Sequence, residues 1–139
     1  MKYVSQSARF SPCGRYRYNL LRNWDGKKGH VLFIGLNPST ADHKTDDPTI
    51  RRCVGFAKLW GYGSMEIVNL FAYKATYPKD LFAADNPIGP RNNYWINKAY
   101  TRSDNTIACW GSLGNYQQRA ANVMKRLGKL QCLQINKGN

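Results

Sequence analysis

The sequence predicts an α/β fold: a three-layer α/β/α sandwich around a short and mainly parallel central sheet. Short apolar runs typical of buried strands occupy residues 31–35, 65–71 and 105–110. Segments with the apolar spacing of helices separate these runs along the chain. Because strands that alternate with helices pair in parallel through crossover connections, helices are expected to cover both faces of the sheet.

The chain opens with a lead in which basic and aromatic residues alternate. Its segments 8–11 and 15–22 flank a Ser-Pro-Cys-Gly sequence and predict either an antiparallel hairpin or an irregular lead. Residues 31–35, Val-Leu-Phe-Ile-Gly, predict the first core strand. This strand is expected to end at Gly35 in a polar turn that Pro38 stiffens.

A helix is expected near residues 48–60. Pro48 suits the first helical turn, and Asp46 and Asp47 complement the positive end of the helix dipole. The rest of the chain predicts a strand, a loop, a helix, a strand, a helix and a short strand, in that order: 65–71, 76–90, 91–102, 105–110, 115–127 and 130–135.

The length of 139 residues predicts one domain, 1–139, large enough to bury a core. No apolar run reaches the roughly 18 residues of a membrane span, and the N-terminus lacks the apolar segment of a signal peptide. We therefore expect a soluble, cytoplasmic protein that has no membrane partner.

The four cysteines are Cys13, Cys53, Cys109 and Cys132, and none forms a Cys-x-x-Cys pair. Zinc and iron–sulfur sites normally contain such pairs, so we expect no metal site and no cofactor. Cys109 and Cys132 lie in apolar segments and are interpreted as small core residues.

Positive charge is in large excess, with 21 Lys and Arg against 8 Asp and Glu and a net charge of +13. Residues 1–30 hold seven basic residues and one acid, residues 105–139 hold five and none, and residues 31–104 hold nine and seven. If both ends lie on one face, they form a surface suited to phosphate backbones. The alternative is an evenly spread charge that only maintains solubility.

Asn37, Asn69 and Trp110 stand at the ends of three predicted strands. In an open α/β sheet, ligands bind at the carboxyl ends of the strands. Asn37 either positions a water or a polar substrate, or closes an Asx turn. Asn69, inside an otherwise apolar strand, either reads the edge of a nucleobase or ties down a neighbouring loop. Trp110 either stacks on a ring or fills a corner.

The sequence motifs, taken in order, resemble a bacterial and phage family known only as a domain of unknown function, DUF1643. The resemblance runs from about Phe10 to the C-terminus. Its motifs are Gly-Leu-Asn-Pro-Ser-Thr-Ala-Asp at 35–42, Asp-Pro-Thr-Ile-Arg-Arg-Cys at 47–53, Val-Asn-Leu-Phe-Ala at 68–72, Ala-Thr at 75–76, Gly-Pro-Arg-Asn at 89–92 and Trp-Gly at 110–111. That family in turn resembles the uracil-DNA glycosylase superfamily in motif order and fold.

The resemblance implies a uracil-DNA glycosylase-like fold. It also implies a DNA glycosylase that flips a modified or mismatched base and hydrolyses its N-glycosidic bond. Asn37 matches the Asn of the Gly-x-Asn-Pro turn in the mismatch-specific branch and is expected to position the attacking water, assisted by Asp42. Asn69 matches the base-reading Asn, and Phe71 and Leu36 are expected to contact the base.

The residues expected to contact DNA phosphates follow the turn or lie in basic segments: Ser39, Thr40, Arg51, Arg52 and Lys74. For the three cations among them, a solvated basic face is the alternative. For Asp42, the alternative is that it belongs to a group of acids that only stabilise the N-terminus of the following helix.

One motif of the glycosylases has no counterpart in this sequence. Their His-Pro loop after the last strand supplies a cation near the leaving base, whereas this chain has no histidine after His43. Two other functions therefore stay open: a non-catalytic nucleic-acid-binding relative, and an enzyme that acts on free nucleotides or nucleosides. The identity of the base also stays open, because an amide presents either a donor or an acceptor.

Overall fold

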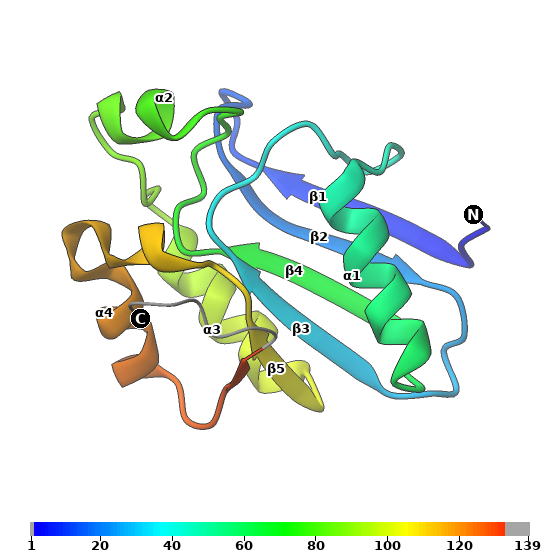
Figure 1. Ribbon diagram of the computed structural model, residues 1–139. Coiled ribbons are helices and arrows are strands. Elements are labelled where there is room, and N and C mark those ends of the chain that lie inside the picture. The colour runs from blue at the N-terminus through cyan, green and yellow to red at the C-terminus, as the bar shows by residue number, and fades with distance from the viewer. Residues whose placement is uncertain (1, 133–139) are drawn as a thin grey trace.

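Six strands form one mixed sheet in the order β1-β2-β4-β3-β5-β6 (Figure 1). The computed structural model describes residues 2–132. The strands are β1 Ser5–Phe10, β2 Arg17–Asn23, β3 His30–Gly35, β4 Ser64–Asn69, β5 Asn105–Ala108 and β6 Gln131–Cys132. β4, β3, β5 and β6 run parallel, whereas β1, β2 and β4 pair antiparallel.

The prediction of a mainly parallel sheet was wrong, because the N-terminal hairpin is part of the sheet. The hairpin itself is confirmed, since β1 and β2 pair antiparallel. β2 then docks against β4, where Leu20 lies opposite Ile67. A local pattern of residues predicts a hairpin but not the strand on which the hairpin docks, so the antiparallel half of the sheet was missed.

Helices cover both faces of the sheet (Figure 1). They are α1 Pro48–Leu59, α2 Pro78–Ala83, α3 Asn92–Arg102, α4 Arg119–Arg126 and a 3-10 helix, η1 Ser112–Gln118. The helices expected at 48–60 and 91–102 are confirmed, but the loop expected at 76–90 contains α2. Within residues 2–132, none of the helices is both long and apolar enough to traverse a lipid bilayer.

The helix expected at 115–127 is interrupted at its start. Gln117 and Gln118 have φ angles of 55° and 56°, in the left-handed region, so regular α-helix begins only at Arg119. Of the strand expected at 130–135, Gln131 and Cys132 form β6, and the remaining positions lie outside the described residues.

The core has two halves, one on each face of the sheet. On the α1 side, Val31 and Phe33 pack with the buried face of α1. On the other side, Leu32 and Ile34 pack with residues of α3 and α4. Both faces of β3 are therefore buried, which explains its continuous apolar sequence.

A buried arginine anchors the long loop 36–47 to the sheet. Arg22 is fully buried, and its Nε lies 2.9 Å from Oδ1 of Asp46. Its Nη2 donates to the carbonyl of Asp42 at 2.6 Å, and Tyr3 donates its hydroxyl to the Asp46 carboxylate. Burial, together with the hydrogen bond to Asp46, raises the pKa of Tyr3. The loop that carries Asn37 is thus held by an ion pair.

Glu66 of β4 is a fully buried carboxylate on the α3 side of the sheet. Arg102 of α3 binds both of its oxygens, Asn19 donates Nδ2 to Oε2 at 3.0 Å, and His30 lies 3.5 Å from Oε1. Burial by itself favours the protonated acid, but the hydrogen bonds from His30, Arg102 and Asn19 outweigh it and lower the pKa of Glu66. The ionised form of Glu66 therefore fastens α3 to the sheet.

We expect Glu66→Gln to lower the free energy of unfolding by about 1–2 kcal/mol near neutral pH, because Arg102 loses its bidentate partner. The low end of the range reflects the 37% exposure of Arg102. Because the folded-state pKa of Glu66 lies below its unfolded value of 4.5, this stability is complete above pH 4.5 and is lost as the pH falls through the folded-state pKa. Urea unfolding near neutral pH and near pH 3 measures the difference between the two proteins; a difference that does not shrink in acid contradicts this role.

Candidate functional site

The carboxyl ends of β3 and β4 lie side by side, with Gly35 opposite Asn69. Beyond the sheet, the two chain segments stay joined by backbone hydrogen bonds. Leu70 donates to the carbonyl of Gly35 at 2.9 Å, and Ala75 donates to that of Pro38 at 3.0 Å. The turn after β3 and the segment after β4 therefore form one rigid edge, where ligands bind in sheets of this kind.

The amide of Asn37 has a fixed orientation in this edge. Its Nδ2 donates to the carbonyl of Ala75 at 2.8 Å and to that of Pro38 at 3.1 Å. Since both partners are carbonyl oxygens, the nitrogen must face them, and Oδ1 faces away. Asn37 thus joins its turn to the segment after β4 through Nδ2, and not through the Oδ1 acceptor of an Asx turn. Its Oδ1 is left without a partner among the described residues.

The amide of Asn69 has the opposite orientation. Asn69 is 3% exposed, and its Oδ1 accepts from Nη2 of Arg17 at 3.3 Å. Because a guanidinium only donates, the Oδ1 must face Arg17, and Nδ2 is a donor without a partner among the described residues. This nitrogen lies against Gly35, where an added Cβ would approach it to 2.9 Å. Glycine at 35 therefore makes room for the amide.

Arg17 is a site residue that the sequence reasoning missed. It is 2% exposed, its Nη1 donates to the carbonyl of Ala41 at 3.2 Å, and its Nε has no partner among the described residues. Burial lowers its pKa to about 10, so the side chain stays charged at neutral pH. It was counted only as one positive charge among many, because no local pattern marks a buried arginine.

Asn92 and Arg119 hold the same edge from the α3 side. Asn92 Nδ2 donates to the carbonyls of Asn69 at 2.8 Å and Leu70 at 3.0 Å, and Arg119 Nε donates to that of Leu70 at 2.7 Å. Asn92 Oδ1 and Arg119 Nη2 are buried without a partner among the described residues. The sequence offered a signal for Asn92, which ends the Gly-Pro-Arg-Asn motif, but none for Arg119.

The three aspartates of the loop after β3 all make structural contacts. Asp47 caps α1 through Ile50 N, and Asp46 pairs with the buried arginine of β2. Asp42 accepts hydrogen bonds from the backbone N–H groups of residues 44 and 45, which lower its pKa. The sequence interpretation of these acids as helix N-terminal charges holds for Asp47. Asp42, the expected assisting carboxylate, is a weakened base on an otherwise exposed loop.

Phe71 and Leu36, the expected base contacts, lie on the α3 side of the edge. Phe71 is 0% exposed and packs edge-on against Phe82, with Tyr116 next to it. Leu36 is half-buried and packs on the same cluster. Because the rings of Phe82 and Tyr116 pack against Phe71 in this conformation, they must move before a ligand can contact it.

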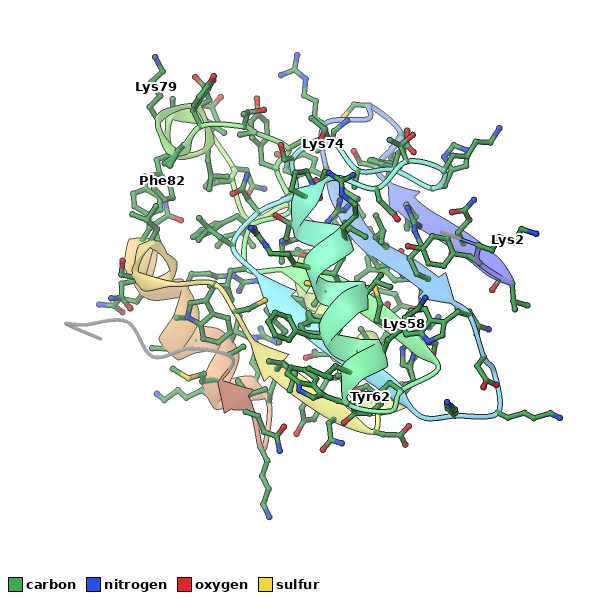
Figure 2. The ribbon with its side chains drawn as sticks, turned by 45° about the vertical axis from the view of Figure 1, so that its right-hand side comes forward. Lys2, Lys58, Tyr62, Lys74, Lys79 and Phe82 are labelled. Carbon is green, nitrogen blue, oxygen red and sulfur yellow. The ribbon has the colours of Figure 1, made fainter. Side chains whose placement is uncertain are left out.

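The five expected phosphate contacts come from three segments of the chain: the turn after β3, helix α1 and the segment after β4. Ser39 and Thr40 lie in the turn, Arg51 and Arg52 are exposed on α1, and Lys74 follows β4, where its Nζ lies 5.2 Å from the centroid of the Phe10 ring. Figure 2 shows lysines such as Lys2, Lys58, Lys74 and Lys79 extending outward from separate elements. Part of the N-terminal excess of positive charge, including Arg17 and Arg22, is buried.

In the part of the chain that the structure describes, no three His, Cys, Asp or Glu side chains are grouped so that they could hold a metal ion. Apart from the Asp47 carboxylate, whose charge partly offsets the lowering of the Arg17 pKa by burial, the polar side chains that converge at this edge are amides and guanidinium groups. Such groups bind carbonyls, ring nitrogens and anions through hydrogen bonds.

We expect Gly35→Ala to destabilise the fold by about 1–3 kcal/mol, because the new Cβ pushes Asn69 away from Arg17. Gly55→Ala is the matched control: Gly55 lies in α1, an added Cβ there meets nothing within 4 Å, and removing a helical glycine should stabilise by about 0.5–1 kcal/mol. Thermal and urea unfolding measure the change in the free energy of unfolding for each of the two variants. Equal effects of the two substitutions would show that residue 35 has room for a side chain.

No curated protein and no solved structure matches this chain. A family model, described as a protein of unknown function (DUF1643), matches residues 17–139. The match begins at Arg17 and spans every motif of the edge at the ends of β3 and β4. The chain therefore belongs to the DUF1643 family.

Proposed function

We propose that this protein binds DNA, flips out a modified or mismatched base and hydrolyses the N-glycosidic bond of that base. The observation that supports the proposal is the pair of oppositely oriented amides at one sheet edge. Asn37 offers a free acceptor and Asn69 a free donor. The first suits a water nucleophile and the second suits a base, on what we propose is a glycosylase-like three-layer fold.

The chemistry places different demands on the two amides. Cleavage of an N-glycosidic bond builds positive charge on the sugar and negative charge on the departing base. Asn37 Oδ1 accepts a hydrogen bond from the attacking water and orients its lone pair toward the sugar. As the water oxygen bonds to the sugar carbon, the bond to the base breaks, and the proton that the water loses passes to solvent. Asn69 donates to the departing base, and the charged Arg17 behind Asn69 stabilises the negative charge. Arg17 thus supplies a cation that the glycosylases obtain from their His-Pro loop.

The orientation of Asn69 narrows the class of base. Because Arg17 holds Oδ1, Asn69 presents its N–H donors to the ligand. Donors pair with the keto oxygen at C4 of uracil and thymine, and not with the amino group that cytosine has at the same position. Since Asn69 is only 3% exposed, the base reaches it only after the residues that cover it have moved.

A non-catalytic base-binding protein is the second candidate. It is favoured by the two hydrogen bonds that commit Asn37 to closing its loop, and by the lowered pKa of Asp42, which weakens it as a base. Such a protein uses the same edge to hold a flipped base without cleaving it.

Release of free base tests the proposal directly. Duplex DNA carrying uracil, mismatched thymine or modified cytosine is incubated with the protein, and the released base is quantified by chromatography. We expect release of the keto bases, and Asn37→Ala is expected to slow it by roughly 100-fold or more with little change in DNA affinity. Binding without release of any base in the panel would refute the glycosylase and support the second candidate.

The salt dependence of binding tests which arginines contact phosphates. Each phosphate contact contributes about −0.9 to the slope of log K against log salt. We expect Arg51→Gln with Arg52→Gln to make this slope shallower by about 2. Lys2→Gln with Lys28→Gln removes the same charge from exposed positions away from the site and should leave the slope unchanged. A slope that neither pair alters would mean that α1 presents only a solvated basic face.

A further inference from the structure

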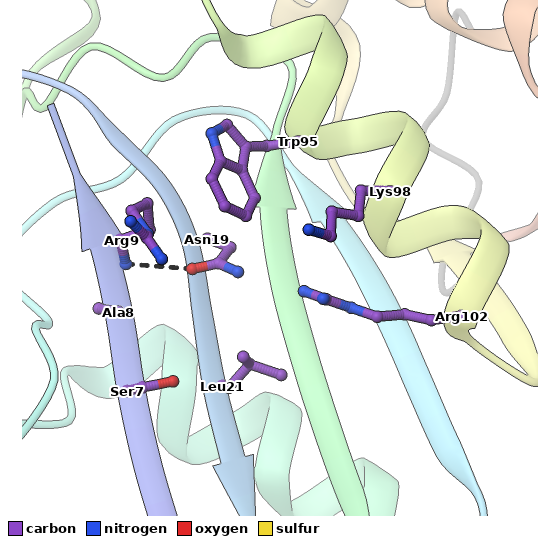
Figure 3. A pocket seen from close by; sticks show the side chains of 8 residues that line it. All are labelled: Ser7, Ala8, Arg9, Asn19, Leu21, Trp95, Lys98 and Arg102. Carbon is purple, nitrogen blue, oxygen red and sulfur yellow. Dashed lines mark hydrogen bonds between the residues drawn. The ribbon is translucent and has the colours of Figure 1, made fainter.

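A cavity of about 220 Å³ lies between the β1–β2 hairpin and α3 (Figure 3). It is on the α3 side of the sheet, whereas Asn69 packs on the α1 side with Arg17. The lining comes from both strands and from one face of α3: Ser7, Ala8, Arg9, Asn19, Leu21, Trp95, Lys98 and Arg102. The cavity is thus distinct from the edge described above.

Two cations without carboxylate partners converge in this cavity. The guanidinium carbon of Arg9 lies 5.0 Å from the centroid of the Trp95 ring, and Nζ of Lys98 lies 5.4 Å from the same centroid. In residues 2–132, neither cation forms an ion pair with an acid. Arg102, the third cation, is neutralised by Glu66. The cavity therefore carries a net excess of two positive charges, which an anion would balance.

The floor of the cavity is formed by Asn19, whose side chain is held in place by hydrogen bonds. Asn19 is 5% exposed, its Oδ1 accepts from the backbone N–H of Arg9 at 3.0 Å, and its Nδ2 donates to Glu66 at 3.0 Å. Figure 3 shows Trp95, Lys98 and Arg102 reaching from α3 over Asn19 toward β1 and β2. With both ends of its amide engaged, Asn19 fixes the shape of the floor, and the charged ends of Arg9 and Lys98 are left to bind.

An aromatic surface adjoins the two cations. Tyr94 is 49% exposed, and its ring lies edge-on to Trp95 at a centroid distance of 5.3 Å. Arg91 and Lys98 flank the Tyr94 ring at 5.0 Å and 5.7 Å. Cations interleaved with exposed aromatic rings are the pattern by which proteins hold phosphates and stack bases of unpaired nucleotides.

We propose that this cavity and the adjoining Tyr94 form a second binding site, for a nucleotide unit. Arg9 and Lys98 bind its phosphate and Tyr94 stacks on its base. A volume of about 220 Å³ is smaller than the roughly 300–1,000 Å³ of whole-ligand pockets, so it holds the phosphate while the base lies outside. The unit is either a free nucleotide or part of a single strand, and its binding does not depend on cleavage of any base.

Titration with thymidine monophosphate and with a ten-residue thymidine oligonucleotide tests the site and separates the two sources. Calorimetry gives the affinity, and the indole N–H signals in NMR spectra give the place of binding. We expect the Trp95 signal to shift while that of Trp24, on the α1 side, does not. If thymidine monophosphate saturates the site, a free nucleotide is sufficient as its ligand. If only the oligonucleotide saturates it, the ligand is part of a single strand.

Arg9→Gln with Lys98→Gln is expected to weaken binding at least about tenfold, since each lost charged hydrogen bond costs on that order. Lys58→Gln with Lys79→Gln is the matched control: it removes the same charge, and Lys58 also lies over a tryptophan ring, that of Trp24, at 5.5 Å. The control pair should bind like the wild type. Failure of both probes to bind, an equal loss in the control pair, or a loss in Asn69→Ala with none in the Arg9 and Lys98 variant would overturn the proposal.

Discussion

Three buried guanidinium groups fix the segments that follow the carboxyl ends of β3 and β4. Arg22 pins the loop 36–47 through Asp46, and Arg17 joins that loop to Asn69. Arg119 secures the first turn after β4 through the carbonyl of Leu70. Burying a charge costs free energy unless its hydrogen bonds are made, so each arginine restricts its loop to the conformations that satisfy it. The fixed positions of the side chains at this edge follow from the need to satisfy each buried charge.

The same burial has an electrostatic consequence. Desolvation lowers the pKa of both Arg17 and Arg119 to about 10, yet both remain cations at neutral pH. Each also keeps a buried N–H without a partner among the described residues, Nε of Arg17 and Nη2 of Arg119. A cation with unused donors next to an amide attracts negative charge, and such charge develops on a departing base. In the glycosylase reaction that we propose, the constraint that shapes the edge thus also favours an anionic leaving group.

The sequence was sufficient where the signal is local. The apolar run of β3 and the Asp47-Pro48 start of α1 are both found where they were expected. It was insufficient where partners lie far apart along the chain: Arg22 meets Asp46 24 residues away, and Arg17 meets Asn69 52 residues away. A count of charges along the sequence treats every arginine as a surface residue. Phe71 shows the same limit, because its position after a strand does not reveal the rings of Phe82 and Tyr116 that bury it.

A register shift in the β1–β2 hairpin determines which side chains of β2 lie on each face of the sheet. Leu20 packs on the α1 side, so strict alternation along β2 would place Arg17 on the α3 side together with Asn19. The pairing instead shifts register, from Arg9 opposite Asn19 to Phe10 opposite Arg17. A bulge of this kind redirects the side chains beyond it. Asn19 can therefore form the floor of the cavity beside α3 while Arg17 reaches Asn69, so one short strand supplies a polar anchor to each of the two binding surfaces that we propose.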